Sequence, residues 1–248
     1  MLASDLAYAL DAALWARSLG FDPDPWQAAL LRNAGSRSLL NCSRQTGKST
    51  VTALLALHTA IYRPGALVLL LSPSLRQSSE LFRKVAGYYG RISAGAPADA
   101  ESTLRLDLAT GSRIVSLPGS EATIRGYSGV NLLIIDEASR VPDDLYMAVR
   151  PMLAVSGGAL LAMSTPWGKR GWWWQEWEHG GQGWQRVMVK ASDCPRIPAA
   201  FLKEERDHLG DYWYRQEYEC EFMDSQTSAF GYEHVLAATK EEVTTWEL

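Results

Sequence analysis

A strand, a tight loop and a helix follow one another near the N-terminus, and this succession constrains the fold more than any other feature. Residues 38–42 form an apolar run that predicts a strand, and residues 49–62 have the pattern of a helix. Strand, loop and helix in this order are the context that a phosphate-binding loop requires. The loop and the start of its helix read Ser43, Arg44, Gln45, Thr46, Gly47, Lys48, Ser49 and Thr50.

The loop ends in Gly-Lys-Ser, the last part of the phosphate-binding motif G-x-x-x-x-G-K-[ST]. Backbone N–H groups of such a loop and the positive end of the following helix hold phosphate oxygens. We therefore expect Lys48 to reach the β- and γ-phosphates and the Ser49 hydroxyl to ligate Mg²⁺. The chain departs from the motif at Cys42, which takes the place of the first Gly. Because Gly-Lys-Ser alone often occurs by chance, the motif needs a partner elsewhere in the chain.

Apolar runs without alternation predict strands that are buried on both faces of a sheet. Three such runs follow the loop, at residues 66–71, 132–135 and 159–163. Two alternating segments around Ala-Thr-Gly-Ser, at residues 104–108 and 113–117, predict a hairpin. Helix-like segments separate the buried runs, so the sequence predicts an α/β fold. We expect a mostly parallel central sheet with helices on both faces.

The ends of the chain are predicted to be helical. Leu2, Leu6, Leu10 and Leu14 recur at helical spacing, and Gly20 is expected to end that helix. Residues 91–102 are rich in Ala, Gly and Pro and predict a loop. A tryptophan-rich helix after Gly171, a strand near 186–189 and helices at 198–208 and 211–219 complete the expected order.

Composition bounds the class of protein. The chain has 248 residues, enough for one large α/β domain with a small appendage, and its net charge of −4 excludes a generally basic nucleic-acid binder. Its three cysteines form no closed disulfide framework and have no metal-site spacing, which fits a reducing cytoplasm. The N-terminus lacks the basic region of a signal peptide, and no apolar run approaches membrane-spanning length. We expect a soluble intracellular protein.

The partner of the phosphate loop is the acidic pair Asp136-Glu137, which directly follows a buried strand. A strand end beside the loop would place Asp136 at the Mg²⁺ through water, and Glu137 would polarise the water that attacks the γ-phosphate. The alternative is that the pair only caps a strand. Two such signals at strand ends, in the right order, favour a magnesium-dependent nucleoside triphosphatase.

Two further strand ends carry polar residues. Ser164 and Thr165 end the run at 159–163, where a hydroxyl would sense the γ-phosphate and relay hydrolysis to the rest of the domain. The run at 66–71 lies in sequence between the loop and the acidic pair, which indicates the additional-strand catalytic-glutamate type of P-loop NTPase. The polar loop after it, residues 72–78, would contact nucleic-acid backbone or form a simple turn, and both interpretations stay open.

These stretches together resemble the N-terminal ATPase domain of tailed-bacteriophage terminase large subunits, the motors that package DNA. The resemblance spans about 200 residues in family order. It rests on Pro25-Trp26-Gln27, the loop from Cys42 to Thr50, Ser72-Pro73-Ser74, Ile124-Arg125-Gly126, Leu133-Ile134-Ile135-Asp136-Glu137-Ala138, Ser164-Thr165-Pro166-Trp167-Gly168 and Gln216-Glu217-Tyr218 with Phe222.

The resemblance implies roles for individual residues. Trp26 and Gln27 would recognise adenine, and packing of the N-terminal helices is the alternative for Trp26. Arg44 would contact phosphate from within the loop. Arg125 would enter a neighbouring subunit's active site as an arginine finger, with Arg140 as a second candidate. Ser164 and Thr165 would form the coupling motif.

The resemblance also implies cofactors, partners and boundaries. ATP would be the substrate, with Mg²⁺. The partners would be double-stranded DNA, a homo-oligomeric ring (fivefold in the family), the portal protein and the small terminase subunit, with no membrane. The protein would act in the host cytoplasm and transiently at the procapsid portal. We expect N-terminal helices with the adenine element at 1–35, the P-loop core at 36–192, and a C-terminal helical segment and linker at 193–248. No nuclease activity is expected in this chain.

Two other functions remain open on the residues alone. The chain would be a superfamily-2 helicase-like fragment, although a second motor domain is missing, or a nucleotide-gated docking module with little turnover. The tryptophans at 172, 173, 174 and 177 favour core packing over base stacking, because helical spacing places 173 and 177 on one face. Arg83, Lys84 and Arg91 would form a basic patch or a solvated surface.

Overall fold

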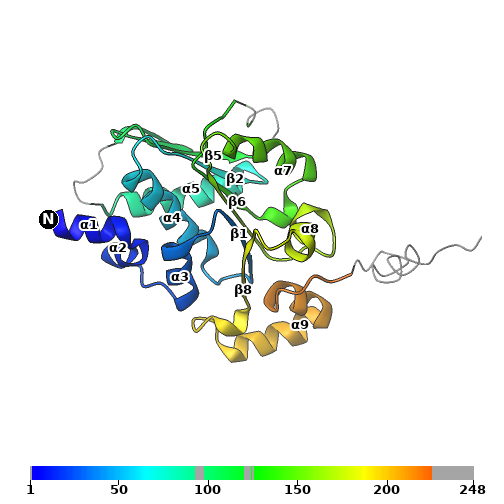
Figure 1. Cartoon of the computed structure of the whole chain (residues 1–248). Coiled ribbons are helices and arrows are strands. Elements are labelled where there is room, and N and C mark those ends of the chain that lie inside the picture. The colour runs from blue at the N-terminus through cyan, green and yellow to red at the C-terminus, as the bar shows by residue number, and fades with distance from the viewer. Residues whose placement is uncertain (1, 93–97, 120–123, 125, 225–248) are drawn as a thin grey trace, which may run out of the picture.

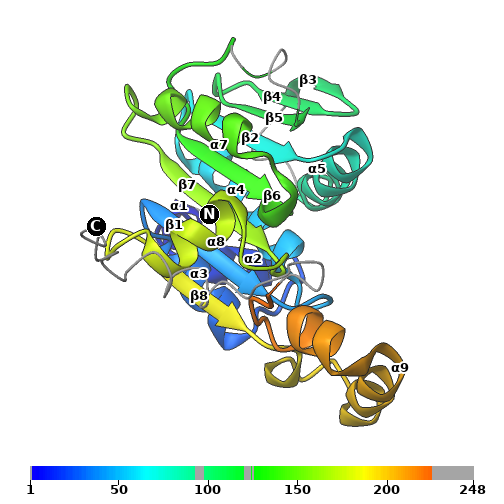
Figure 2. The same cartoon turned by 90° about the vertical axis from the view of Figure 1, so that its right-hand side faces the viewer.

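The computed structural model describes residues 2–92, 98–119, 124 and 126–224. The described residues form one eight-stranded sheet with the strand order β3-β4-β5-β2-β6-β7-β1-β8, and Figure 2 shows this order running down the molecule. The strands are β1 (Arg37–Cys42), β2 (Leu67–Ser72), β3 (Ala98–Ser102), β4 (Arg105–Leu108), β5 (Arg113–Pro118), β6 (Leu132–Asp136), β7 (Ala159–Ser164) and β8 (Gln185–Val189).

Helices cover both faces of this sheet (Figure 1). On one side lie α1 (Leu2–Leu10), α2 (Ala12–Ser18), α3 (Pro25–Asn33), α4 (Lys48–Tyr62) and α5 (Leu75–Tyr89), and on the other lie α7 (Asp143–Val149) and α8 (Gly171–His179). The long helix α9 (Ala199–Tyr218) lies beyond the β8 edge in both views. Short 3₁₀ turns are η1 (Ala138–Arg140), η2 (Arg150–Leu153) and η3 (Ala191–Asp193). The predicted α/β fold is confirmed.

Six neighbouring strands, from β5 to β8, pair in parallel, whereas β3 and β4 pair antiparallel at one edge. The predicted hairpin is the antiparallel pair β4–β5. The strand that lies between β1 and β6 in the sheet is β7, since Asn41 pairs with Ser164 and Asp136 with Met163. The run at 66–71, which sequence order suggested as the inserted strand, is β2 and lies on the other side of β6.

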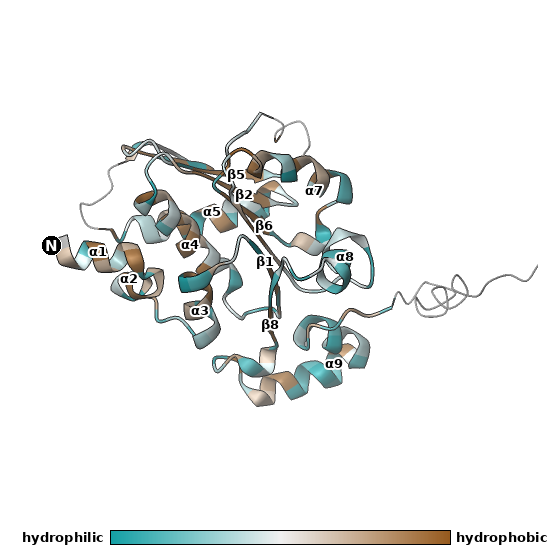
Figure 3. Ribbon diagram, viewed as in Figure 1, coloured by the Kyte–Doolittle hydropathy of each residue, from teal (hydrophilic) through white to brown (hydrophobic). Residues whose placement is uncertain are grey.

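The central strands are apolar throughout because each has a core on both faces. Successive residues alternate between two clusters. Leu40, Val68 and Ile134 face the cluster under α2–α5, and Leu39, Leu69 and Ile135 face the cluster under α7 and α8. The central strands are accordingly brown in Figure 3, whereas α9 is mostly teal. The absence of alternation in the sequence is thus the signature of double burial.

The single N-terminal helix that was expected to run to Gly20 is two helices, α1 and α2. The helix is interrupted at Asp11, whose Oδ1 accepts from the N–H groups of Ala13 and Leu14 at 2.9 and 3.0 Å and starts α2. Leu6, Leu10 and Leu14 are 61%, 79% and 40% exposed. The buried side chains on α2 are instead those of Ala12, Ala13, Trp15 and Ala16.

Two other expectations meet the structure differently. The expected loop at 91–102 contains β3, which pairs with β4, and residues 93–97 of it lie outside the described part. The two expected C-terminal helices are the halves of α9, since Gly210 has a φ of 75° and interrupts the helix. No helix among the described residues has the length and apolar character needed to cross a bilayer.

Candidate active site

The phosphate loop connects the end of β1 to the start of α4. Ser43 donates its N–H to the Val189 carbonyl of β8 at 2.9 Å, and the Thr46 hydroxyl donates to the Ser43 carbonyl at 2.9 Å. Gln45 and Gly47 have φ values of 64° and 86°, in the left-handed region. These conformations turn the chain sharply, so that Gly47 becomes the residue that precedes the first turn of α4.

Lys48 is the first residue of α4 and is buried, with Nζ 3.5 Å from the Ser43 carbonyl. Its ammonium therefore lies folded back along the loop. The next residues, Ser49 and Thr50, are half-buried in the first turn of the helix. Cys42, where the motif has Gly, is fully buried at the end of β1, and burial raises the pKa of its thiol, so it packs as an apolar side chain.

Asp136 ends β6, two strands away from the phosphate-loop strand. It is buried, and burial followed by the charge of Glu137 raises its pKa to about 6, while Lys48 opposes the shift. The Lys48 ammonium and the Asp136 carboxylate are therefore close enough to interact. The two signals that the sequence places about ninety residues apart meet at one edge of the sheet.

Glu137 has an unusual backbone, with φ 49° and ψ 45° in the left-handed region. Its N–H donates to Asp136 Oδ1 at 2.9 Å, which partly offsets the burial of that carboxylate. A non-glycine residue in this conformation is strained, and such residues gather at functional sites. Its side chain is half-buried.

Ser164 contacts the turn that follows the acidic pair. Its Oγ donates to Ser139 Oγ at 2.7 Å and accepts from the Ser139 N–H at 3.2 Å. Thr165 beside it is also buried. Because β7 lies between β1 and β6, these hydroxyls stand between the phosphate loop and Glu137. This is the position that a residue coupling the two would need.

Gln27 lies against the phosphate loop. Its Nε2 donates to the Thr46 carbonyl at 3.1 Å, its Oε1 accepts from the Asp24 N–H at 2.9 Å, and the residue is 1% exposed. Trp26 is half-buried and packs on the core under α2–α5, with no hydrogen-bond partner for its Nε1 among the described residues. These surroundings agree with the alternative in which Trp26 packs among the N-terminal helices.

Two residues of the C-terminal segment reach the phosphate loop and had no role in the sequence prediction. Glu217 accepts from Arg44 Nε at 2.6 Å. Arg196 binds Asp24 and the Thr46 carbonyl. Glu217 belongs to the Gln-Glu-Tyr stretch of the family resemblance, which was its available signal, whereas nothing in the local sequence marks Arg196.

Of the two arginine-finger candidates, the structure describes only Arg140. Arg125 lies outside the described residues. The Arg140 guanidinium lies 3.1 Å from the centroid of the Trp167 ring in the same chain. Burial lowers the pKa of Arg140, and the charges of Glu217 and Glu137 oppose that shift. Arg140 is thus engaged beside its own acidic pair.

Arg83, Lys84 and Arg91, which would form either a basic patch or a solvated surface, have separate surroundings. Arg83 pairs with Glu80 at 2.9 Å, and Arg91 donates to the Leu19 carbonyl at 3.0 Å and stacks on Tyr88. Burial lowers the pKa of Lys84, and the first charge that opposes this shift is that of Asp136.

The tryptophan-rich helix is part of the core, as predicted. Trp172, Trp173 and Trp174 are at most 5% exposed, and Trp172 stacks on Tyr146 with centroids 3.9 Å apart.

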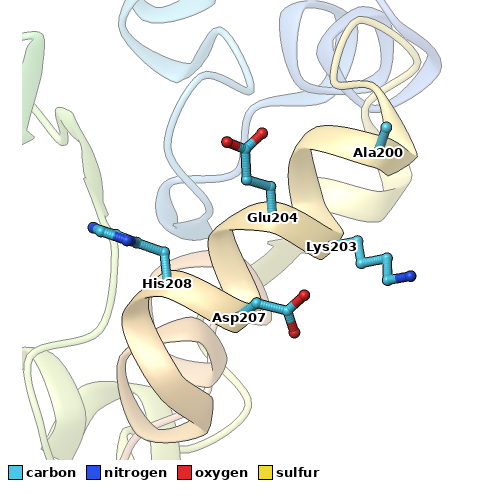
Figure 4. Close-up of a pocket in the computed structure, with 5 residues that line it drawn as sticks. All are labelled: Ala200, Lys203, Glu204, Asp207 and His208. Carbon is cyan, nitrogen blue, oxygen red and sulfur yellow. The ribbon is translucent and has the colours of Figure 1, made fainter.

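The polar turn after β2 provides the start of α5, since Ser74 Oγ accepts from the Gln77 N–H. A hollow along α9 is lined by none of the site residues described above. Figure 4 shows its lining, which comes from just over two turns of that one helix: Ala200, Lys203, Glu204, Asp207 and His208.

The oxygen donors at the site suit Mg²⁺. This ion commonly takes one or two carboxylates and completes its shell with substrate phosphates and water. The described residues contain no cluster of three or more His, Cys, Asp or Glu side chains that would hold a metal by themselves. A buried Asp136 with a raised pKa is a carboxylate that a cation would stabilise, and the Ser49 hydroxyl is available at the start of α4.

Relatives of this chain share its sequence or fold. The terminase large subunit of Thermus virus P23-45 is 27% identical over 249 aligned residues, which cover 86% of this chain and 51% of the relative. The chain thus spans about half the length of the curated relatives it matches.

Solved structures show the same fold. The large terminase ATPase domain of Thermus phage P74-26 has a TM-score of 0.73 at 22% identity, covering 84% of this chain and 97% of that domain. The large terminase of bacteriophage HK97 has a TM-score of 0.66 at 15% identity, covering 81% of this chain and 51% of that one.

The family match excludes the helicase-fragment interpretation. A model of the family described as terminase large subunit, T4likevirus-type, N-terminal, matches residues 39–235. That span includes the phosphate loop, the acidic pair, Ser164, Thr165 and α9. The chain therefore belongs to the family of terminase large subunits of the T4likevirus type, as their N-terminal part.

Proposed function

We propose that this domain binds ATP with Mg²⁺, hydrolyses it, and uses the energy to drive double-stranded DNA into a procapsid. One observation carries the proposal. Three adjacent parallel strands, β1, β7 and β6, end at the same edge of the sheet, where β1 leads into the loop before Lys48, β7 ends at Ser164 and β6 ends at the acidic pair. Ligands of open parallel sheets bind at such an edge.

The chemistry follows from these side chains. The loop N–H groups, Lys48 and Thr50 bind the phosphates, while Ser49 and Asp136 hold Mg²⁺, which neutralises charge on the β- and γ-phosphate oxygens when bound. Glu137 accepts a proton from water as the water oxygen bonds to the γ-phosphorus. The bond from that phosphorus to the bridging oxygen breaks, which releases ADP and inorganic phosphate. Gln45 and Thr46 shape the loop. Trp26 and Gln27 lie at the border of the site that would hold the base.

Replacement of Glu137 tests the hydrolytic role. We expect Glu137→Gln to lower the rate of phosphate release by about 10² to 10⁴-fold, because a general base is lost without a change in shape. Binding of a non-hydrolysable ATP analogue should stay within about threefold of the wild type. Lys48→Ala should instead abolish binding. Glu204→Gln, on the exposed face of α9, is the matched control and should change neither.

The ion pair between Arg44 and Glu217 favours one second function, a nucleotide-gated docking module. Because this pair joins the phosphate loop to α9, bound nucleotide would set the position of the C-terminal segment for a portal or small-subunit partner. Phosphate release separates the two functions. Tight ATP binding without turnover, in the isolated domain and in the assembled motor, would favour docking.

The motor partners belong to the same proposal. A homo-oligomeric ring at the portal would place Arg125 of each subunit near the neighbouring active site, where a guanidinium stabilises transition-state charge. We expect Arg125→Ala to reduce the ATPase rate of the assembled motor while nucleotide binding by the isolated domain is unchanged. An unaltered rate in the assembled motor would remove the trans role.

A further inference from the structure

Arg196, between η3 and α9, forms a three-point contact with the phosphate-loop region. Its Nη1 donates to Asp24 Oδ1 at 2.6 Å and its Nη2 to Asp24 Oδ2 at 2.8 Å. The same Nη2 donates to the Thr46 carbonyl at 3.2 Å. The contact therefore joins the C-terminal segment to two N-terminal segments that are 172 and 150 residues away in sequence.

This pair differs from an ordinary surface ion pair. Exposed pairs contribute little because solvent screens them and two long side chains lose freedom. The Arg196 side chain is 50% exposed, but the Asp24 side chain is only 13% exposed, and the guanidinium binds both carboxylate oxygens in parallel. Arg206 and Asp211 on α9 provide the contrast: the arginine is equally exposed at 50%, but Asp211 is 59% exposed and the pair shares one hydrogen bond. The fork geometry of Arg196 is one that lysine cannot reproduce.

Arg196 and Gln27 act on the same few atoms. The Thr46 carbonyl accepts from both Arg196 Nη2 and Gln27 Nε2, while the Asp24 N–H donates to Gln27 Oε1. A Cβ placed on Gly47 would lie 2.7 Å from Gln27 Nε2 and 3.7 Å from Arg196 Nη2. Asp24 also precedes α3, the helix that carries Trp26 and Gln27. Arg196 thus fixes the loop backbone and the start of α3 relative to each other.

We propose that Arg196 is a positioning residue for nucleobase selection, which holds Gln27 against the Thr46–Gly47 backbone through Asp24. The inference rests on the proposed function, in which Gln27 recognises adenine. Loss of the guanidinium leaves the largely buried Asp24 carboxylate without its partner, and such a group no longer fixes the start of α3. The base-recognition side chain then loses its fixed distance from the phosphates, whereas the phosphate-binding N–H groups and Lys48 remain.

The test is equilibrium binding of ATP, GTP and inorganic tripolyphosphate to wild type, Arg196→Gln, Arg196→Lys and Asp24→Asn, with Arg206→Gln as the matched control. We expect Arg196→Gln to weaken ATP binding about tenfold and to reduce the preference for ATP over GTP by a similar factor. Tripolyphosphate binding should change less than about threefold. Arg196→Lys should resemble Arg196→Gln, and Arg206→Gln should resemble the wild type.

A double-mutant cycle sharpens the test. If Arg196 acts through Asp24, the double variant should lose no more selectivity than either single variant. In turnover assays the loss should appear in KM for ATP, with kcat within about twofold. Selectivity is measured by binding, so it can be determined even if the wild type shows no ATP turnover. An absence of turnover would contradict the proposed function but not the inference about Arg196.

Three results would overturn the inference. The first is a wild type that binds ATP and GTP equally. The second is an Arg196→Gln variant that loses tripolyphosphate binding as strongly as ATP binding, which would indicate direct phosphate contact. The third is a variant with a lower Tm and unchanged base preference, which would indicate a purely structural ion pair.

Discussion

The Nε of Arg44 donates to Oε2 of Glu217 across 2.6 Å, so that the phosphate loop is paired with the last turns of α9, 173 residues away. The two partners are unequal in exposure, at 64% for the arginine side chain and 11% for the glutamate side chain. A triphosphate at the loop would offer Arg44 a second anion. Glu217 and the nucleotide would then compete for one guanidinium, which would link nucleotide binding to the position of the C-terminal segment.

This competition predicts that Glu217→Gln binds ATP more tightly. With the carboxylate removed, Arg44 is available to the phosphates, and we expect an affinity gain of about three- to tenfold, smaller at high salt. Equilibrium binding of a non-hydrolysable analogue at two salt concentrations measures it. Glu221→Gln, which removes the partner of Arg215 on the same segment, is the control and should have no effect. Unchanged affinity in Glu217→Gln would mean that Arg44 never turns to the nucleotide.

Magnesium binding should depend on pH through Asp136. Burial and the charge of Glu137 raise the pKa of Asp136 to about 6, and a protonated carboxyl is a poor ligand. As the pH falls below about 6, the apparent Kd for Mg²⁺ should rise by about tenfold per pH unit, because one proton competes with the ion. Mg²⁺ titration of nucleotide binding between pH 5 and 7.5 measures this.

Glu137→Gln provides the control for that prediction. Removing the neighbouring charge should lower the Asp136 pKa, so the midpoint of the magnesium effect should move to lower pH. A pH profile identical in the two proteins would show that another group governs magnesium binding.

Gly47→Ala should lower stability by more than its backbone strain alone, and it should also weaken ATP binding. With φ 86°, an alanine there costs about 1–2 kcal/mol in left-handed strain, and its Cβ would lie 2.7 Å from Gln27 Nε2. Gly65 has φ 73° with nothing within 4 Å, so Gly65→Ala isolates the strain. Urea unfolding should show a larger stability loss for Gly47→Ala, and this variant alone should lose ATP binding. Equal losses in both variants would contradict the packing of Gln27 on the loop.

The free energy of unfolding of the domain should fall in mild acid because of His58. Burial lowers the pKa of His58 below its usual 6.5, while the Tyr8 carbonyl and Asp11 oppose the shift. The unfolded chain therefore binds this proton more tightly, so stabilisation is complete above about pH 6.5 and decreases as the pH falls toward the folded pKa. Urea unfolding at pH 7.5 and 5.5 measures the decrease.

His58→Gln should show a smaller decrease between these two pH values than the wild type. Asp136 titrates in the same range with the opposite sign, because its pKa is raised in the folded state. That contribution is common to both proteins and cancels in the comparison. An equal decrease in both proteins would assign the acid sensitivity to other groups.

Much of the fold could be predicted because its signals are local. Apolar runs without alternation identified the buried strands, and the Ala-Thr-Gly-Ser turn identified the β4–β5 hairpin. Prediction failed where a local signal was ambiguous. The leucine spacing in the first fourteen residues suggested one helix up to Gly20, but Asp11 starts a second helix, whose small side chains pack in the core with Trp15.

The sequence alone determined which residues form the candidate site, since Gly47-Lys48-Ser49 and Asp136-Glu137 are recognisable from residue type and spacing. Tertiary structure decided which strand separates them, β7 rather than β2, and which distant side chains close around the loop. The Arg44–Glu217 and Arg196–Asp24 pairs join residues 173 and 172 positions apart. A pattern along the chain reports what each residue can bind and how its neighbours fold. The pattern carries no information on which remote charged side chain will lie opposite a given residue. That depends on where the strands and helices lie in the folded domain.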